Sequence, residues 1–124
     1  MKYMLDTNIL IKLKDRMRLE KVDDICISAI TYAELEFGVS KSQNQEKNRK
    51  ALLTVMSGIT VVPFDADAAR TYGDIRASLE SKGNMIGPND TLIAAHAKSL
   101  NLTLVTNNTR EFDRVEGLNV GDWT

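Results

Sequence analysis

The sequence has few of the residues that form crosslinks, bind soft metals or interrupt helices. Its 124 residues include one cysteine, Cys26, one histidine, His96, and two prolines. A single cysteine excludes an internal disulfide, and its place in the apolar run 25–27 is typical of a buried thiol in a reducing compartment. One histidine and one cysteine are also too few for a usual zinc site.

The chain also lacks a long apolar stretch and an excess of charge. The longest segment without an ionisable side chain, residues 51–64, is interrupted by Gly58 and Pro63 and is too short to span a bilayer. Asp6 stands where a signal peptide would be apolar, so we expect no targeting segment and a cytoplasmic protein. The net charge of −1 gives no overall attraction to a polyanion. The densest basic stretch, residues 12–21, serves either as a phosphate contact or as a solvated face.

Strands and helices are predicted to alternate along the chain. Apolar runs predict strands at 3–5, 25–27, 59–62 and 102–105, with a short last strand around Val120. Helical spacing predicts helices between them, with Ser28 and Asp65 as N-caps and Gly38 and Gly83 near two C-terminal ends. This order predicts an α/β fold with one domain over residues 1–124, in which helices flank a central parallel sheet of four to five strands.

Two acids fall at informative places in this pattern. Asp6 follows the first strand, at the sheet edge where such folds bind ligands, although an N-cap role explains it equally well. Glu34 lies on a helical stripe that we expect to be buried, together with Ile30, Ala33 and Phe37. A charge directed inward is costly unless it meets a cation or a metal, so Glu34 is a candidate site residue.

A third acid, Asp90, stands in the first turn of a later helix, where the helix dipole favours it. Capping explains each acid alone, but it does not explain three acids on or beside the buried side of their own elements. Carboxylates brought together repel one another, and protonation or a hard divalent cation relieves the repulsion. Oxygen ligands favour Mg²⁺ or Mn²⁺, so the expected chemistry is metal-assisted hydrolysis of a phosphodiester.

Other chemistries have little support in the sequence. His96 follows Asp90 by six residues and therefore lies off its helix face, so we interpret it as a packing or surface residue. Neither a glycine-rich phosphate loop nor a nucleophile-elbow sequence occurs.

Four motifs together resemble a known family. They are residues 4–8 (MLDTN), residues 27–31 (ISAIT) leading to Glu34 and Gly38, residues 86–90 (IGPND) continuing to 94–97 (AAHA), and residues 105–112 (VTNNTREF). In this order and spacing they resemble PIN-domain proteins, specifically the VapC-type toxins of bacterial toxin–antitoxin pairs. The resemblance covers essentially the whole chain.

This resemblance implies an α/β/α fold and an Mg²⁺-dependent endoribonuclease in which Mn²⁺ can substitute. It places Asp6, Glu34 and Asp90 on three of the family's acidic positions. As a mechanistic hypothesis, we expect Asp6 and Asp90 to bind Mg²⁺ directly and Glu34 to hold a second ion or a metal-bound water. It also implies a homodimer and a VapB-type antitoxin, whose C-terminal segment blocks the active-site groove and which carries the contacts to promoter DNA. The implied substrate is the anticodon stem-loop of initiator tRNA.

The sequence departs from the family pattern after the fourth strand. Many PIN domains have a fourth acid there, where this chain has Asn107 and Asn108. Either an amide holds a metal-bound water or Glu111 supplies the missing carboxylate, and we predict Glu111. The predicted polar support comprises Thr7, Asn8, Thr106 and Asn108. The predicted RNA contacts are Lys12, Lys14, Arg16 and Arg110.

Two alternatives stay open at this point. One is a PIN nuclease that acts on other RNA or on single-stranded DNA. The other is a chain that serves chiefly as a subunit of an autoregulatory DNA-binding complex. The dimer surface is also undetermined, with Tyr72 or the helix face of residues 52–56 as candidates.

Overall fold

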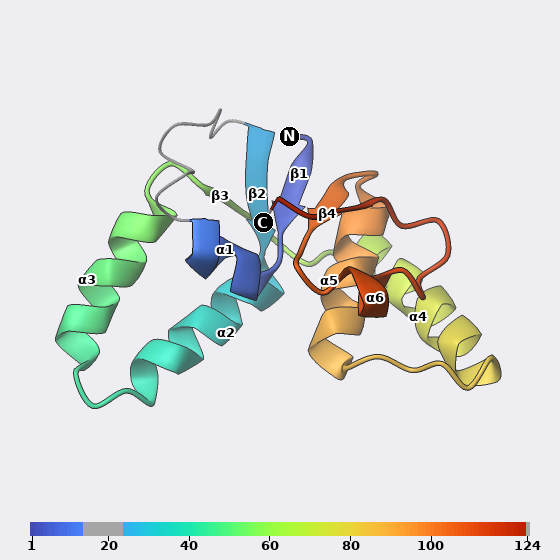
Figure 1. Cartoon of the computed structure of the whole chain (residues 1–124), viewed down its shortest axis with the longest axis horizontal. Coiled ribbons are helices and arrows are strands. Elements are labelled where there is room, and N and C mark those ends of the chain that lie inside the picture. Colours follow the sequence, from blue (N-terminus) through green and yellow to red (C-terminus); the bar gives the residue numbers. More distant parts are fainter. Residues whose placement is uncertain (14–23, 124) are drawn as a thin grey trace.

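The computed structural model describes residues 1–13 and 24–123, and it shows one parallel sheet between two groups of helices (Figure 1). The strands are β1 (Tyr3–Leu5), β2 (Ile25–Ser28), β3 (Thr60–Val62), β4 (Thr103–Val105) and β5 (Val120–Gly121). Their order across the sheet is β3-β2-β1-β4-β5, and each neighbouring pair is parallel. The predicted α/β fold with a parallel sheet is confirmed.

Six helices are seen in the described part of the chain. They are α1 (Thr7–Leu13), α2 (Ala29–Ser40), α3 (Gln45–Met56), α4 (Ala66–Ser81), α5 (Pro88–Ser99) and α6 (Thr109–Phe112). Ser28 caps α2 and Asp65 caps α4, because their side chains accept bonds from the backbone N–H groups of Ile30 and Ala68. Both predicted N-caps are confirmed.

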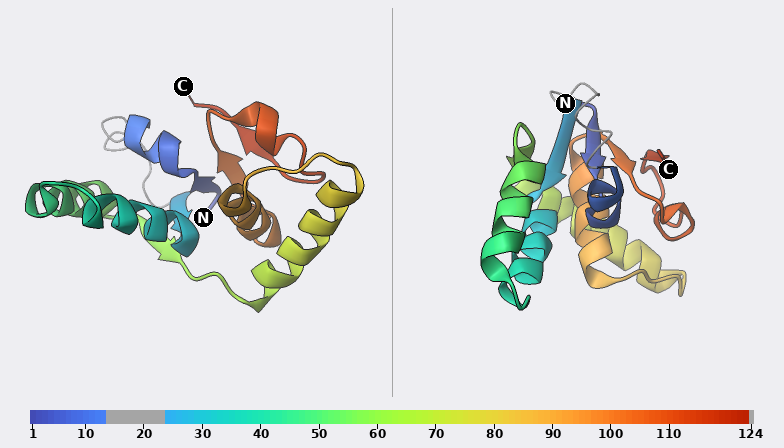
Figure 2. Two further views of the ribbon diagram at one scale, coloured as in Figure 1. Left: turned by 90° about the horizontal axis from the view of Figure 1, so that it is seen from below. Right: turned by 60° about the vertical axis from the view of Figure 1, so that its left-hand side comes forward.

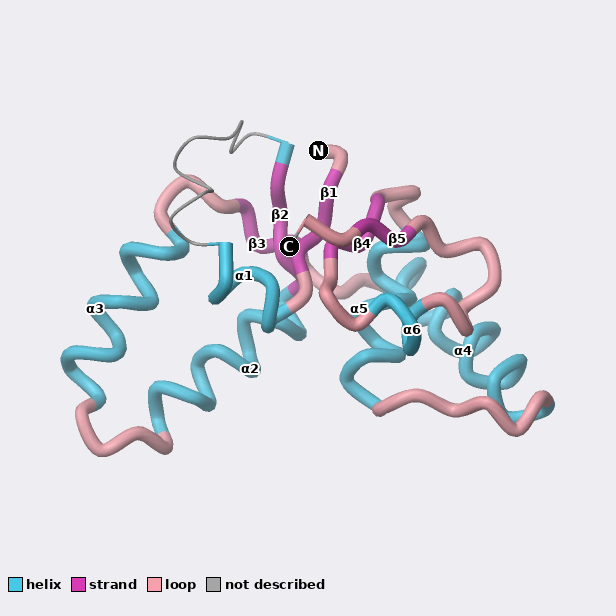
Figure 3. The backbone as a smooth tube through the Cα atoms, in the orientation of Figure 1, coloured by secondary structure: helices cyan, strands magenta, loops and turns pink. Residues whose placement is uncertain are grey.

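The strands direct alternate side chains to opposite faces of the sheet. Met4, Cys26 and Leu104 belong to a core shared with α4, α5 and α6. Leu5 and Val105, one residue further along, belong to a second core shared with α1, α2 and α3. Figures 2 and 3 show the two groups of helices on either side of the strands. The cysteine therefore lies in a core, as predicted, with its side chain fully buried.

The predicted buried stripe of α2 is wrong. Phe37 is 65% exposed and Ala33 is exposed, while the helix buries Thr31 and Val39 instead. The reason is tertiary, since α2 and α3 extend together beyond the sheet and α2 turns another face toward α1 and α3 (Figure 1). The spacing of apolar residues did not determine which face meets a neighbour.

Two helix boundaries also differ from the prediction. α2 continues past Gly38 to Ser40, and α5 begins at Pro88, before the predicted loop ends at residue 89. Proline is favourable at the first helical position because its missing N–H has no intrahelical partner there. Asp90 stays in the first turn of α5, as predicted.

The strand order contains one reversal of direction. The chain runs from β1 outward to β3, and it then returns to β4 on the other side of β1. In open parallel sheets, ligands bind at the carboxyl ends of the strands where the order reverses. The fold therefore points to the edge formed by the ends of β1 and β4. No helix in the ranges 1–13 and 24–123 has the length and apolar character needed to cross a membrane.

Candidate active site

Asp6 and Thr106 follow the two strands at this reversal. Register pairs Leu5 with Val105, and the Asp6 N–H donates to the Val105 carbonyl over 2.9 Å. Asp6 is only 5% exposed. Its Oδ1 accepts from the Thr7 N–H at 2.8 Å and its Oδ2 accepts from the Thr106 hydroxyl at 3.0 Å. Each oxygen of the Asp6 carboxylate therefore accepts one hydrogen bond, and the two bonds hold the side chain in place at the sheet edge.

Glu34 approaches this edge from α2. Its Oε1 accepts from the Thr7 hydroxyl at 3.1 Å, which links α2 to the first residue of α1. Glu36 points elsewhere and forms an ion pair with Arg49 of α3, with 2.7 Å between Oε1 and Nη1. The two acids of α2 thus differ in position, as the helical period indicates.

Asp90 and Glu111 reach the same edge from α5 and α6. The Gly87 N–H donates to Glu111 Oε1 at 3.0 Å, and the Asn108 amide donates to Glu111 Oε2. A Cβ added at Gly87 would lie 3.4 Å from Asp90 Oδ2 and 3.9 Å from Glu111 Oε1. The backbone at position 87 therefore lies directly beside both carboxylates, at van der Waals distance from where a Cβ would stand.

Burial and repulsion by neighbouring carboxylates raise the pKa of Asp90 to about 7. Burial is the largest cause, and the negative charges of Glu111, Asp6 and Glu34 act in the same direction. Burial also raises the pKa of Asp6, against the opposing hydrogen bonds from Thr106 and Thr7. The N–H of Gly87 is the main cause that lowers the pKa of Glu111, which therefore stays ionised beside Asp90. Four carboxylates from distant segments thus share one electrostatic environment.

These residues suit a hard divalent cation. All four donors are carboxylates, the ligands that Mg²⁺ and Mn²⁺ prefer, and a dication relieves the repulsion that raises the pKa of Asp90. Within the described residues, no group of three or more acidic, histidine or cysteine side chains is arranged to hold an ion without adjustment. Binding would therefore draw carboxylate oxygens toward one another.

The raised pKa of Asp90 predicts how the stability of the metal-free protein depends on pH. The folded protein holds this proton more tightly than an unfolded chain, whose pKa is near the ordinary 3.8. The stabilisation is thus fully present below the unfolded pKa and is lost as the pH rises through about 7. We expect Asp90→Asn to have a melting temperature that falls less than that of the parent between about pH 5 and about pH 8.

Thermal unfolding in buffers that contain EDTA measures this difference. Saturating Mg²⁺ is expected to recover stability at high pH in the parent more than in Asp90→Asn, because the ion removes the same repulsion. Parallel melting curves for the two proteins across this pH range would contradict the proposed environment of Asp90.

The other predicted site residues differ in how closely they approach the acids. Thr106 also accepts the Asn108 N–H, at 3.0 Å, so Asn108 bonds both Thr106 and Glu111. Asn8 and Arg110 are exposed, on α1 and α6 respectively. Lys12 lies in α1 with its side chain outside the described part, and Lys14 and Arg16 lie outside the described residues.

A groove that sequence reasoning did not find begins beside Glu34. It has a volume of about 410 Å³ and lies between α1, α2 and α3. Its lining is mostly apolar and comprises Thr7, Leu10, Glu34, Leu35, Gly38, Val39, Asn48, Ala51, Leu52 and Val55. The apolar face of α3 considered above as a dimer surface therefore lines a groove that leads to the acids. Only the packing of three helices creates it, so no local sequence signal could have revealed it.

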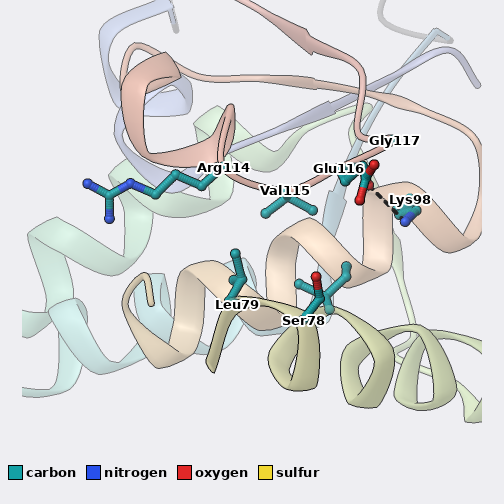
Figure 4. A pocket seen from close by; sticks show the side chains of 8 residues that line it. Ser78, Leu79, Lys98, Arg114, Val115, Glu116 and Gly117 are labelled. Carbon is teal, nitrogen blue, oxygen red and sulfur yellow. Dashed lines mark hydrogen bonds between the residues drawn. The ribbon is translucent and has the colours of Figure 1, made fainter. Parts of the chain in front are cut away.

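A second hollow, of about 260 Å³, lies between α4, α5 and the segment before β5 (Figure 4). Its polar groups do not converge, because Arg114 and Lys98 lie at opposite ends. Lys98 Nζ donates to the Glu116 carbonyl at 2.8 Å and Arg114 Nη1 donates to the Met85 carbonyl at 3.0 Å. These cations bond backbone carbonyls, so the acidic cluster is the better candidate for chemistry.

Comparison with known proteins agrees with this geometry. The family model described as "PIN domain" matches residues 3–118. A protein of Shigella flexneri named "tRNA(fMet)-specific endonuclease VapC" is 44% identical, and the match covers 100% of this chain and 99% of that protein. A protein of Haemophilus influenzae named "Ribonuclease VapC2" is 42% identical, with 99% and 98% covered.

Solved structures give the same result. The DNA-bound VapBC complex from Salmonella typhimurium contains a chain with a TM-score of 0.93 and 40% identity, which covers 100% of this chain and 99% of that one. The VapBC2 complex from Rickettsia felis, bound to a promoter DNA fragment, contains one with a TM-score of 0.91, 40% identity and full coverage of both chains. This chain therefore belongs to the PIN-domain family, among its VapC proteins.

Proposed function

We propose that the chain is a metal-dependent endoribonuclease, the toxin of a toxin–antitoxin pair, which hydrolyses RNA phosphodiesters with Mg²⁺ as the working ion and Mn²⁺ as a substitute. The main support is the set of four carboxylates, Asp6, Glu34, Asp90 and Glu111, around the ends of β1 and β4. PIN-domain nucleases generally depend on divalent metal ions.

Asp6, Asp90 and Glu34 would hold the ion, and Glu111 would complete the acidic cluster. A bound divalent ion would supply an activated water and would neutralise charge on the phosphoryl oxygens. Thr106 and Thr7 hold the Asp6 carboxylate in one orientation, and the Thr7 hydroxyl does the same for Glu34. Gly87 and Asn108 orient Glu111 beside Asp90.

The protonation of Asp90 adds a second element to the mechanism. With a pKa of about 7, its carboxyl is divided between the neutral and the ionised form near neutral pH. An approaching positive charge favours the ionised form, so the site gains negative charge as it becomes occupied. In-line attack by water would leave a 5′-phosphate and a 3′-hydroxyl.

The proposed substrate is initiator tRNA, cut in the anticodon stem-loop. The support comes from the 44% identical Shigella protein, whose name specifies tRNA(fMet). Such a substrate would place the activity in the cytoplasm. The proposed RNA contacts include Arg110, which is exposed on α6 directly before Glu111. Contacts to phosphates from local cations would compensate for the overall charge of −1.

The proposed partners are a second copy of the chain and a VapB-type antitoxin. Solved relatives are complexes of VapB with VapC, two of them bound to promoter DNA or described as DNA-bound. The groove beside Glu34 is suitable for an apolar antitoxin segment because its walls include Leu10, Val39, Leu52 and Val55. We propose that promoter DNA is contacted only through the antitoxin.

Cleavage of total bacterial tRNA by the purified protein tests this function. We expect cuts at one tRNA with Mg²⁺ or Mn²⁺, no cleavage with EDTA, and fragment ends that carry a 5′-phosphate and a 3′-hydroxyl. Sequencing of the fragments identifies the substrate and the cut position. A 2′,3′-cyclic phosphate, or activity that survives EDTA, would contradict hydrolysis at this site.

The same preparation distinguishes the two alternatives. Cleavage of single-stranded DNA at a rate that matches tRNA would favour a nuclease with a different substrate. Operator binding by the isolated chain, without antitoxin, would favour a role as a DNA-binding subunit.

A further inference from the structure

The buried histidine, His96, forms a side-chain hydrogen bond that involves none of the four carboxylates. His96 lies on α5 and is 1% exposed, and its Nδ1 is 2.7 Å from the hydroxyl oxygen of Ser28. Its ring forms a T-shaped contact with the ring of Phe64, with 5.3 Å between the ring centroids. A side-chain hydrogen bond between residues 68 positions apart, buried in a core, fixes the relative placement of two elements.

The direction of the hydrogen bonds follows from the groups around the ring. The backbone carbonyl of Pro63 also bonds the imidazole, and a carbonyl can only accept. Because Nδ1 faces Ser28, we infer that Nε2 is the nitrogen that carries the proton toward Pro63. Nδ1 then accepts from the Ser28 hydroxyl, whose oxygen accepts the Ile30 N–H at 3.0 Å. This network is complete only with the neutral Nε2–H form of the ring.

Ser28 occupies a special place between the layers. It ends β2 and caps the N-terminus of α2. The strand period directs its side chain to the same face as Cys26, toward α5, although α2 lies on the opposite face. The bond to His96 therefore joins the start of α2, which carries Glu34, to α5, which carries Asp90.

We propose that Ser28 and His96 act as a positioning pair that sets the placement of Glu34 relative to Asp90 across the end of the sheet. Ser28 is the N-cap of α2 and precedes Glu34 by six residues, and His96 follows Asp90 by six residues on α5. A change at the bond would therefore move the helices that carry the two carboxylates. The inference rests on the proposed function of the carboxylates, although neither Ser28 nor His96 is itself a proposed metal ligand.

The first test reads the histidine itself. His96 is the only histidine of the chain, so its ring ¹⁵N signals are assigned without ambiguity. We expect the spectrum of the whole protein at neutral pH to show the neutral Nε2–H form with Nδ1 as an acceptor, and Ser28→Ala to shift the Nδ1 signal. Ring ¹⁵N signals that are the same in Ser28→Ala as in the parent would overturn the proposal, because they would mean that the two side chains are not bonded.

The second test compares two N-cap variants. Ser28→Ala removes the cap of α2 and the bond to His96, whereas Asn44→Ala removes only the cap of α3, which accepts the Lys47 N–H. Both are measured well below their melting temperatures. We expect Ser28→Ala to lower kcat about 10- to 100-fold with KM for RNA little changed, the range seen when a group behind a metal ligand is removed. Asn44→Ala is expected to keep kcat.

Variants of the histidine complete the experiment. His96→Asn keeps an acceptor oxygen near the position of Nδ1, and His96→Leu removes it, so the former is expected to retain more of kcat. The effects of Ser28→Ala and His96→Leu in one chain are expected to be less than additive because both remove the same bond. If His96→Leu does not fold, the kcat values of Ser28→Ala and His96→Asn still test the proposal.

Mn²⁺ affinity, measured by calorimetry, separates this inference from the proposed function. A drop in affinity for Ser28→Ala but not for Asn44→Ala supports the positioning pair even where the parent cleaves no RNA, an outcome that would refute only the proposed function. Unchanged Mn²⁺ affinity together with an unchanged kcat in Ser28→Ala would overturn the pair and leave the proposed function intact.

Discussion

Asp6→Asn is expected to reduce metal-dependent RNA cleavage by about 100- to 1,000-fold, the range found when one preorganised electrostatic group is removed. The substitution keeps the shape of the side chain but removes its charge from the end of β1. Because Asp6 is buried among other acids, its loss also lowers the repulsion in the cluster. The metal-free variant should therefore melt at the same temperature as the parent or higher.

Initial rates with Mg²⁺, together with a thermal melt in EDTA, measure both effects. Asp74→Asn is the matched control, since Asp74 is an exposed acid on α4 and the same charge is removed. We expect this control to cleave at the parental rate. A rate for Asp6→Asn within tenfold of the parent would exclude Asp6 from the reaction.

Phe112→Ala is expected to destabilise the fold by about 3–5 kcal/mol, the usual cost of removing a large aromatic side chain from a core. Phe112 is fully buried at the end of α6, in the core that contains Leu104 and Ile93. A short helix has little stability of its own, so this side chain attaches α6 to the sheet. Urea unfolding of the metal-free protein measures the change.

Phe37→Ala is the matched control for this substitution. Phe37 is 65% exposed on α2, and the Lys41 ammonium lies 5.2 Å from its ring centroid. Its removal is expected to change the free energy of unfolding by no more than about 0.5 kcal/mol. A large loss of stability for Phe37→Ala, or a small one for Phe112→Ala, would contradict the exposure of Phe37 and the burial of Phe112.

The strands and caps were predictable because their signals are local. The run of residues 25–27 is apolar throughout and rich in β-branched residues, and Ser28 accepts a backbone N–H two residues later. Asp6 was predictable as a candidate site residue for a related reason, since it directly follows a strand that such a pattern places in a parallel sheet.

The orientation of α2 was not predictable in the same way. Ile30, Ala33 and Phe37 form a regular apolar stripe, yet Phe37 faces solvent and Val39 is buried. The pattern shows that a face is apolar, but it does not say which neighbour covers it. Glu34 reaches the site beside Thr7 although the reason given for it, a buried stripe, was wrong.

By itself, the sequence determined the alternation of strands and helices, the parallel sheet and the acids that follow its elements, because spacing and capping act over a few residues. Only the tertiary structure decided which acids share one environment, where the groove beside Glu34 lies, and that Ser28 bonds His96. These relations join residues far apart in the chain, and they depend on the order of strands and the packing of helices across the sheet. Local sequence patterns give no information about the distance between such residues. The site therefore forms only when the helices pack on the two faces of the sheet.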